Sequence, residues 1–319
     1  MKILFTGASS FTGMWFVKEL ARAGHDVTAT FRESLDKYQG IRLERIKIAT
    51  QFCKPVYECS FGSESFLQLI NSSNKWDMLC HHAADVHEYK SPDFNFVAAL
   101  ANNTSHIKEV LNALRHQGCY RLLLTGSVFE QNEGVGSDNL RAVSPYGLSK
   151  GLTTDVFRYF AQTMGFKLGK FVIPNPFGPY EELRFTTFLM QAWSTSRTAS
   201  VSSPAYVRDN IHVSLLAKAY AKFASTLTTE QGFVKINPSG YVESQGAFTM
   251  RFAKEMRQRI AMLPCHYDLL EQTEFLEPKV RINMDGLKYQ ELGWNEEYAW
   301  DELADYYKAF VMKNQWKFS

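Results

Sequence analysis

The sequence predicts an α/β protein built on a doubly wound parallel sheet, with a smaller substrate-binding lobe towards its C-terminal end. Three observations lead to this prediction. Short apolar runs alternate with longer amphipathic stretches over roughly the first 180 residues, which is typical of a parallel sheet with crossover helices. Several of the runs are apolar on both faces, as buried parallel strands are. The alternation then stops at a proline-rich segment, residues 174–179.

The expected strands are short and are bounded by turn residues. They cover residues 3–6, 27–31, 56–59, 78–83, 121–125 and 167–173. The first expected helix carries an apolar stripe through Trp15, Phe16, Leu20 and Ala23, and Gly24 follows where a helix commonly ends. Two longer helices are expected over residues 93–116 and 144–164.

The segment Pro174-Asn175-Pro176-Phe177-Gly178-Pro179 continues neither a helix nor a strand, because three prolines and a glycine interrupt both. We therefore expect a first domain over residues 1–174, built on the parallel sheet. Residues 175–319 are expected mainly to form the substrate-binding lobe, with some segments returning to the main sheet.

The composition narrows the functional class. Of the 319 residues 45% are hydrophobic and 14% aromatic, which is enough for a buried core. The formal charge of +2 and the scattered basic residues give no reason to expect nucleic acid or an acidic membrane as a partner. Five widely spaced cysteines without a CxxC pair fit reduced thiols and no metal site. Without an apolar leader or membrane span, we expect a cytoplasmic protein.

A strand, a glycine-containing turn and a helix follow one another at the N-terminus. A helix N-terminus offers unpaired N–H groups and a partial positive charge to a pyrophosphate, and glycines let the backbone approach it closely. The residues expected to contact a dinucleotide here are Gly7, Ser9, Ser10, Phe11, Thr12 and Gly13.

At the end of the second expected strand stands Arg32, where NAD enzymes carry an acid that grips the ribose 2′-hydroxyl. A guanidinium there suits a 2′-phosphate, so NADP(H) is favoured. NAD(H) stays possible because Glu33 is adjacent.

The N-terminal turn, placed between the first strand and the first helix, resembles the TGxxGxxG fingerprint of the extended short-chain dehydrogenase/reductases, the NAD-dependent epimerase/dehydratase family. Ser10 stands at the position of the middle glycine. The resemblance implies a Rossmann-type fold, in which residues 1–174 form the dinucleotide-binding domain and also carry the catalytic residues. It also implies cofactor contacts from an H-x-A-A segment, from the residues after the third strand and from a proline beside nicotinamide. These residues are His82, Ala83, Ala84, Ser60, Phe61 and Pro174.

Tyr146 and Lys150 are four residues apart on an expected helix and therefore share one face. A phenol is a poor acid–base group at neutral pH, and a nearby ammonium favours the phenolate, so this pair suits proton transfer. The resemblance implies a third catalytic hydroxyl, which falls on Thr125. Ser127, two residues on, is the alternative and a candidate substrate contact.

The neighbouring residues narrow the reaction. The resemblance implies that 4,6-dehydratases carry Asp-Glu after their threonine and that C3/C5 epimerases carry cysteine at the position of Ser127. Gly126 and Ser127 supply neither an acid nor a thiol. Reduction of a 4-keto sugar with NADPH is favoured. The alternatives are a C4 epimerase with tightly held NAD and a non-catalytic NADP-binding module.

Two further segments resemble those that bind a nucleotide-diphosphate sugar in this family. Asn175 matches an N-x-x-G-P element, and Arg208 begins an R-D-x-I-H-V segment whose arginine holds the diphosphate. Arg281 is a further candidate for a phosphate contact. The resemblance also implies a homodimer formed through the two long helices.

Overall fold

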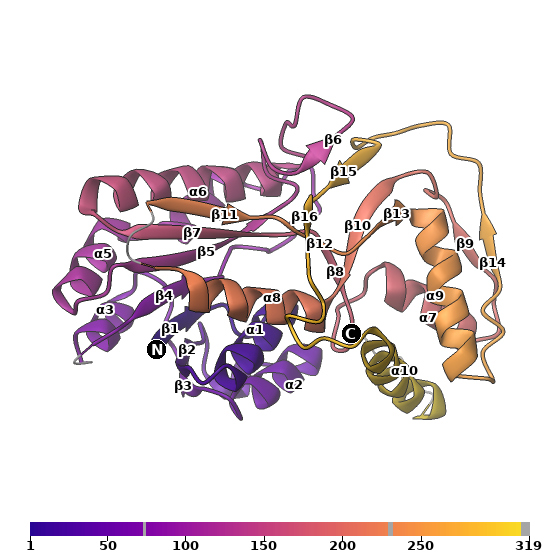
Figure 1. The fold of residues 1–319 in the computed structure, drawn as a ribbon, viewed down its shortest axis with the longest axis horizontal. Coiled ribbons are helices and arrows are strands. Elements are labelled where there is room, and N and C mark those ends of the chain that lie inside the picture. Colours follow the sequence, from indigo (N-terminus) through magenta and orange to yellow (C-terminus); the bar gives the residue numbers. More distant parts are fainter. Residues whose placement is uncertain (73–74, 229–231, 314–319) are drawn as a thin grey trace.

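The computed structural model describes residues 1–72, 75–228 and 232–313. Within these residues, a sheet of seven strands forms the centre of the molecule, and every neighbouring pair in it is parallel. From one edge to the other, the strands are β3 (Lys54–Val56), β2 (Asp26–Thr30), β1 (Lys2–Thr6), β4 (Met78–His81), β5 (Arg121–Ser127), β7 (Lys167–Ile173) and β11 (Phe233–Ile236). The predicted doubly wound parallel sheet is confirmed, and its order reverses between β1 and β4 (Figure 1).

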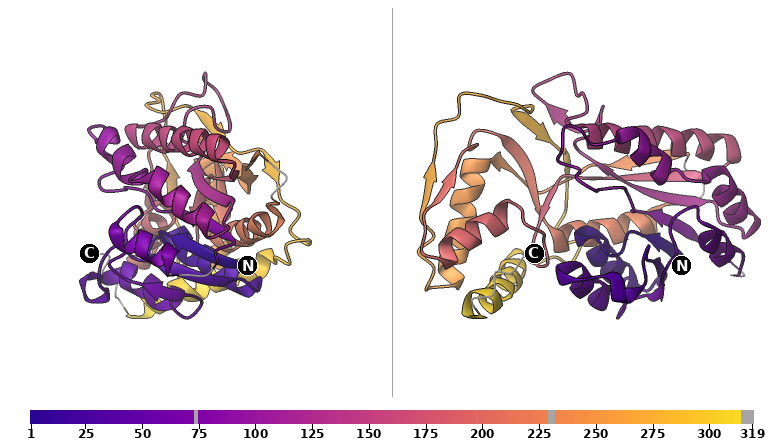
Figure 2. Two further views of the ribbon diagram at one scale, coloured as in Figure 1. Left: turned by 90° about the vertical axis from the view of Figure 1, so that its left-hand side faces the viewer. Right: turned by 180° about the vertical axis from the view of Figure 1, so that it is seen from behind.

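Helices cover both faces of this sheet (Figure 2). One face carries α1 (Phe11–Arg22), α2 (Gly40–Ala49) and α8 (Val213–Thr226). The other carries α3 (Glu64–Asn71), α4 (Phe96–Asn103), α5 (Ile107–His116) and α6 (Pro145–Met164). A short 3₁₀ helix, η1 (Leu35–Lys37), follows β2. Each face therefore has its own apolar core.

Helix α6 shows how local sequence sets the bounds of an element. Ser144 caps its N-terminus by accepting a hydrogen bond from the Gly147 N–H, and Pro145 occupies the first turn. The helix ends at Gly165, whose φ of +75° is left-handed. Because capping and termination are both local, the predicted span of 144–164 agrees with the observed one.

Two predicted elements were wrong in their bounds. The third strand is β3, not residues 56–59, because Glu58 adopts a left-handed φ of 54° and ends the extended run. The expected helix over 93–116 is two helices, α4 and α5, with His106 at φ 47° between them. The preceding Ser105 carbonyl packs so closely on Gly62 that a Cβ there would lie 2.1 Å from it.

The lobe lies at one end of the long axis of the molecule (Figure 1). A second sheet contains β8 (Asn175–Phe177), β13 (Tyr241–Ser244), β10 (Val207–His212), β15 (Val280–Ile282) and β6 (Val135–Gly136). Two separate strand pairs accompany this sheet: β9 (Ala199–Val201) with β14 (Tyr267–Leu269), and β12 (Pro238–Ser239) with β16 (Asp285–Gly286). Its helices are α7 (Phe185–Ser194), α9 (Gln245–Arg259) and α10 (Glu296–Lys313).

Aromatic rings fill the core of the lobe. Phe177 from β8 contacts Phe248 of α9 and Trp300 of α10, with ring centroids 5.1 and 5.4 Å apart. Segments that follow residue 174 also build the main domain, because β11 pairs with β7 and α8 packs on α1. The two parts are thus connected through several crossings of the chain.

The described residues also show what is absent. None of their helices is long and apolar enough to cross a membrane. They contain no group of three or more His, Cys, Asp or Glu side chains arranged to hold a metal ion. All five cysteines are free thiols.

Candidate active site

The turn between β1 and α1 depends on its two glycines. Gly7 has a φ of +88°, and a Cβ added to it would lie 2.7 Å from the backbone nitrogen of Ala83. A Cβ on Gly13 would lie 2.2 Å from the Gly7 carbonyl oxygen. Such distances leave no room for any side chain. The turn therefore packs directly against the chain that leaves β4, at the carboxyl edge of the sheet.

Ser10 stabilises this turn in place of a glycine. Its hydroxyl donates to the Gly7 carbonyl at 2.9 Å and accepts from the Gly13 N–H at 3.0 Å, which makes it the N-cap of α1. The same hydroxyl lies 2.9 Å from Nε2 of His82, and Thr12 Oγ1 lies 3.1 Å from that nitrogen. His82 is thus bound to the turn. Burial, followed by the charge of Lys150, lowers its pKa to about 3, so the ring is neutral.

The turn fits a bound pyrophosphate. Among the described residues, no hydrogen bond uses the N–H groups of Phe11 and Thr12, in the first turn of α1. Ser9 lies in the turn itself and is partly buried, and Ala83 and Ala84 follow β4 with partly buried side chains. The predicted residues of this segment therefore lie together around one helix N-terminus.

The residues expected near the adenosine end occupy different environments. Arg32 is exposed just beyond the end of β2, and no ion pair engages it in the described part of the chain. Ser60 is partly buried. Phe61 is 9% exposed and packs in the core, 4.2 Å from the His81 ring and 5.9 Å from the Phe157 ring between centroids. Arg32 is therefore accessible to a ligand, whereas Phe61 is mainly a core residue.

Tyr146 and Lys150 lie in the first two turns of α6, beside the end of β5. Lys150 is 5% exposed, and its ammonium donates to the Thr125 carbonyl oxygen at 2.6 Å. The Tyr146 ring is edge-on to the rings of Tyr89 and Phe94, with centroids 5.4 and 5.9 Å away. No hydrogen bond to another described residue engages its hydroxyl. The loop before α4 thus packs against the Tyr146 ring, which stays partly exposed.

We expected the charge of Lys150 to lower the pKa of Tyr146, but other groups shift that pKa. Burial raises the pKa of the Tyr146 phenol, the Glu130 carboxylate raises it further, and the Arg184 guanidinium opposes both. Burial lowers the pKa of Lys150 to about 8, against the attraction of Glu130. In this state of the chain the phenol is neutral at pH 7, which suits a proton donor.

The residues at the ends of β5 and β7 complete this edge. Ser127 lies opposite Ile173 in the sheet register, so Pro174 and Asn175 follow directly beside it. The hydroxyls of Thr125 and Tyr220 are both buried and close to one another, but neither has a partner with hydrogen-bonding geometry in the described residues. Thr125 therefore contacts the Tyr146/Lys150 pair through its carbonyl oxygen.

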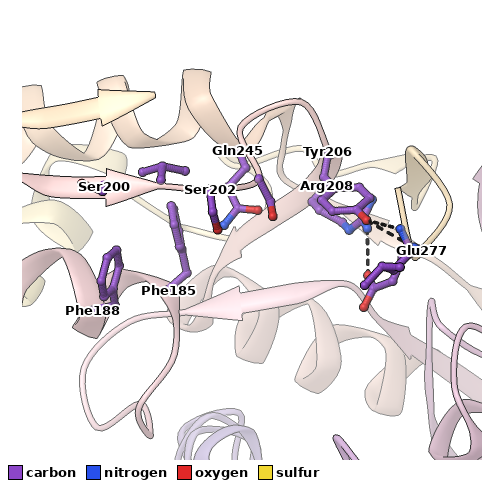
Figure 3. A pocket seen from close by; sticks show the side chains of 11 residues that line it. Phe185, Phe188, Ser200, Ser202, Tyr206, Arg208, Gln245 and Glu277 are labelled. Atoms are coloured by element: carbon purple, nitrogen blue, oxygen red, sulfur yellow. Dashed lines mark hydrogen bonds and ion pairs between the residues drawn. The ribbon is translucent and has the colours of Figure 1, made fainter. Parts of the chain in front are cut away.

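A cavity of about 590 Å³ lies in the lobe (Figure 3). Its walls carry aromatic rings, hydroxyls, an amide and one arginine: Phe185, Phe188, Ser200, Ser202, Tyr206, Gln245 and Arg208. Arg208 stacks on Tyr206 at 4.5 Å and forms an ion pair of 2.9 Å with Glu277. It also donates to the carbonyl oxygens of Val207, Pro278 and Lys279. Arg208 thus lines a cavity, as a ligand-binding arginine would, with its charge already balanced.

The expectation for Arg281 was wrong. Its side chain is fully buried, and its guanidinium donates to the carbonyl oxygens of Val128, Glu130 and Arg141 at 2.6 to 3.0 Å. It therefore connects β15 to the segment that follows β5 and has no access to a phosphate.

The sequence motifs do not account for several residues of this region. Arg184 lies close enough to Tyr146 to affect its pKa, and its Nε is buried without a hydrogen-bond partner in the described residues. The next residue, Phe185, lines the cavity. A residue at the wall of the cavity therefore directly follows, in the chain, a residue that lies close to Tyr146. No motif indicates Arg184, Tyr89 or Phe94, because their positions depend on how the lobe and a loop fold over α6.

The comparisons with known proteins agree with this geometry. The model of the NAD dependent epimerase/dehydratase family matches residues 3–234. No curated protein sequence matches the chain. Similar solved structures include a UDP-glucose 4-epimerase from Thermotoga maritima, with a TM-score of 0.68 and 19% identity, covering 98% of this chain and 100% of that one.

Two others have the same architecture at similar identity. A UDP-glucuronic acid 4-epimerase from Bacillus cereus has a TM-score of 0.71 and 16% identity, covering 97% of this chain and 100% of that one. A dTDP-glucose 4,6-dehydratase from Streptomyces venezuelae has a TM-score of 0.69 and 17% identity, covering 99% of both chains. At these identities the likeness shows the fold, whereas the family model matches most of the sequence. The chain belongs to the NAD dependent epimerase/dehydratase family.

Proposed function

We propose that this protein reduces the C4 ketone of a nucleotide-activated deoxysugar with NADPH. One observation carries the proposal. The Tyr146/Lys150 pair lies at the carboxyl edge of the sheet, which it shares with the glycine turn, while Arg184 and Phe185 join its surroundings to a cavity. A cofactor and a sugar could therefore meet beside one phenol.

Each residue has its own role in the proposed reaction. Tyr146, whose pKa is raised by burial, gives its proton to the C4 oxygen as that oxygen gains negative charge. Lys150, whose ammonium is held by the Thr125 carbonyl oxygen, would bind the nicotinamide ribose. The hydroxyl of Ser127 orients the ketone, because that of Thr125 is buried beside Tyr220. Bound NADPH supplies the hydride. Pro174 would lie beside the nicotinamide, and Asn175 would contact the sugar substrate.

The test is hydride transfer itself. Purified protein should oxidise NADPH, followed by absorbance, when given dTDP-, UDP-, GDP- or CDP-linked 4-keto-6-deoxysugars. Binding of NADP(H) without oxidation across this panel would favour the non-catalytic module instead.

The assignment of NADP(H) rests on Arg32, which is exposed at the end of β2. We expect Arg32→Ala to weaken NADPH binding about 10-fold or more, because one charge-assisted hydrogen bond to the 2′-phosphate is worth about 1.5–3 kcal/mol. NADH binding should hardly change. Fluorescence titration of both cofactors measures this. Arg42→Ala, an exposed arginine on α2, is the matched control. Equal losses for NADPH and NADH would contradict the assignment.

We propose that the cavity holds the nucleotide diphosphate against Arg208. Glu277, 2.9 Å from that guanidinium, then competes with the phosphates. Glu277→Gln should therefore tighten binding of UDP or dTDP about 2- to 5-fold, since a partly exposed ion pair is worth up to about 1 kcal/mol. Arg208→Ala should abolish the gain. Calorimetry with the exposed Glu274→Gln as control measures this, and weaker binding by Glu277→Gln would contradict it.

A second candidate is a nucleotide-sugar 4-epimerase with tightly bound NAD. The similar structures favour it, because they include 4-epimerases, one of them described in complex with UDP-glucuronic acid and NAD. The absorbance spectrum of the purified protein separates the two. An epimerase should carry nicotinamide through purification and interconvert C4 epimers without consuming NADPH.

We further propose a cytoplasmic homodimer formed through the helices α4 and α6. These helices pack on each other, and each exposes an apolar or aromatic side chain, Val97 and Tyr159, both 62% exposed. Such residues suit a helical interface.

A further inference from the structure

A buried charge cluster lies behind the Tyr146/Lys150 pair. Glu130, fully buried just after β5, accepts a hydrogen bond from the Lys170 ammonium of β7 at 2.6 Å. Lys170 also contacts Glu133 at 2.8 Å, and Glu133 in turn pairs with Lys235 at 2.9 Å. Buried charges are costly unless they are paired, so the cluster is balanced as a unit.

Glu130 connects this cluster to both elements that hold the pair. Its Oε1 accepts the Ser127 N–H at 2.7 Å, at the end of β5. Its Oε2 lies 3.4 Å from the Thr154 hydroxyl, which shares its one proton between this oxygen and the Lys150 carbonyl oxygen at 3.2 Å, one turn earlier in α6. One carboxylate thus bridges the strand end and the helix turn that carries Lys150.

The backbone is built for this close approach. A Cβ on Gly147 would lie 2.3 Å from the Phe129 carbonyl oxygen, and one on Gly151 would lie 2.3 Å from the Gln131 side chain. These glycines follow Tyr146 and Lys150 directly, one helical turn apart. The segment 129–131 therefore lies directly against the face of α6 next to the pair.

We propose that Glu130 is the positioning residue of the Tyr146/Lys150 pair, holding α6 against β5 and placing a negative charge near buried Lys150. The role in catalysis rests on the proposed function of the pair. The contacts of Glu130 with β5 and α6 do not depend on the reaction.

The charged groups around the pair support this role. Burial lowers the pKa of Lys150, Glu130 raises it, and Lys170 lowers it. The neighbouring His81 and His82 are neutral. Burial and the Glu130 carboxylate raise the pKa of Tyr146, the Arg184 guanidinium lowers it, and the phenol of Tyr89 raises it. Glu133 touches the same Lys170 but is not among the groups that shift either pKa. Glu130 is therefore the one carboxylate among the described residues that acts on both members of the pair.

The first experiment measures Lys150 directly, without substrate. In protein labelled with ¹³C at the lysine ε carbon, the Lys150 signal is assigned by its loss in Lys150→Met. Its pKa, about 8 in the parent, should fall by about one unit or more in Glu130→Gln, because burial then acts without an opposing charge. Glu133→Gln, the matched control, should leave it nearly unchanged. An unchanged Lys150 pKa in Glu130→Gln would overturn the proposal.

A second variant covers the case in which Glu130→Gln fails to fold with Lys170 left unpaired. Glu130→Gln/Lys170→Met removes the pair together, and the Lys150 pKa should still fall, by less, because the effect of Glu130 exceeds that of Lys170. A Lys150 pKa equal to or above the parent value in this double variant would also overturn the proposal.

The pH profile of turnover is the functional readout. Loss of the Glu130 charge lowers the pKa of both Lys150 and Tyr146, so the alkaline limb should move to lower pH by about one unit. A merely structural role would lower turnover equally at every pH. That uniform loss would refute the positioning role while leaving the reaction assignment intact, since Tyr146→Phe tests the latter.

Discussion

Tyr146→Phe is expected to lower turnover by about 100- to 10,000-fold, the range that a positioned general acid contributes. The phenol is the proton donor in the proposed reaction, and phenylalanine keeps the ring between Tyr89 and Phe94 while removing the hydroxyl. Because no hydrogen bond to another described residue holds that hydroxyl, stability and NADPH affinity should stay close to the parent values. Steady-state kinetics, thermal unfolding and cofactor titration measure the three.

Tyr89→Phe is the matched control for this variant. It removes the hydroxyl of the ring 5.4 Å away and should cost far less turnover. If Tyr146→Phe turns over at a rate near that of the parent, the assignment of Tyr146 as the acid is excluded.

Lys150→Met is expected to abolish most turnover while increasing stability at neutral pH. Lys150 has a pKa of about 8, below its ordinary value of 10.5, so the folded protein carries a buried charge that it disfavours. Methionine removes this cost but also the bond to the Thr125 carbonyl, so we expect a net gain of about 1–2 kcal/mol.

The sign of the pH dependence follows from the direction of the shift. Between about pH 8 and 10.5 the unfolded parent binds more protons than the folded one, so the stability of the parent rises with pH there. The advantage of Lys150→Met should therefore be full below pH 8 and should shrink as pH approaches 10.5. Urea unfolding at several pH values measures it. A difference in stability that does not vary with pH would contradict a lowered Lys150 pKa.

Much of the fold was predictable because its signals are local. Apolar runs set the parallel strands, Ser144 and Gly165 set the ends of α6, and Gly7 and Gly13 set the phosphate turn. The prediction failed where a single backbone conformation decided, as at Glu58 and His106. Left-handed conformations of non-glycine residues leave little trace in composition.

The roles of the arginines were less predictable. Arg208 and Arg281 both belong to segments that suggested phosphate binding. Arg208 lines the cavity, but Arg281 is buried on carbonyl oxygens about 140 to 150 positions away in sequence. An arginine fits a phosphate and a set of carbonyl oxygens equally well, so its residue type does not distinguish them.

The sequence by itself determined the doubly wound sheet, the glycine turn and the helix that presents Tyr146 and Lys150, because each depends on residues close together in the chain. Only the tertiary structure decided which charges surround that pair. Glu130 meets Lys170 across 40 positions, and Arg184 reaches Tyr146 from the lobe. Electrostatic energies depend on distance and burial in space, and residue types alone specify neither.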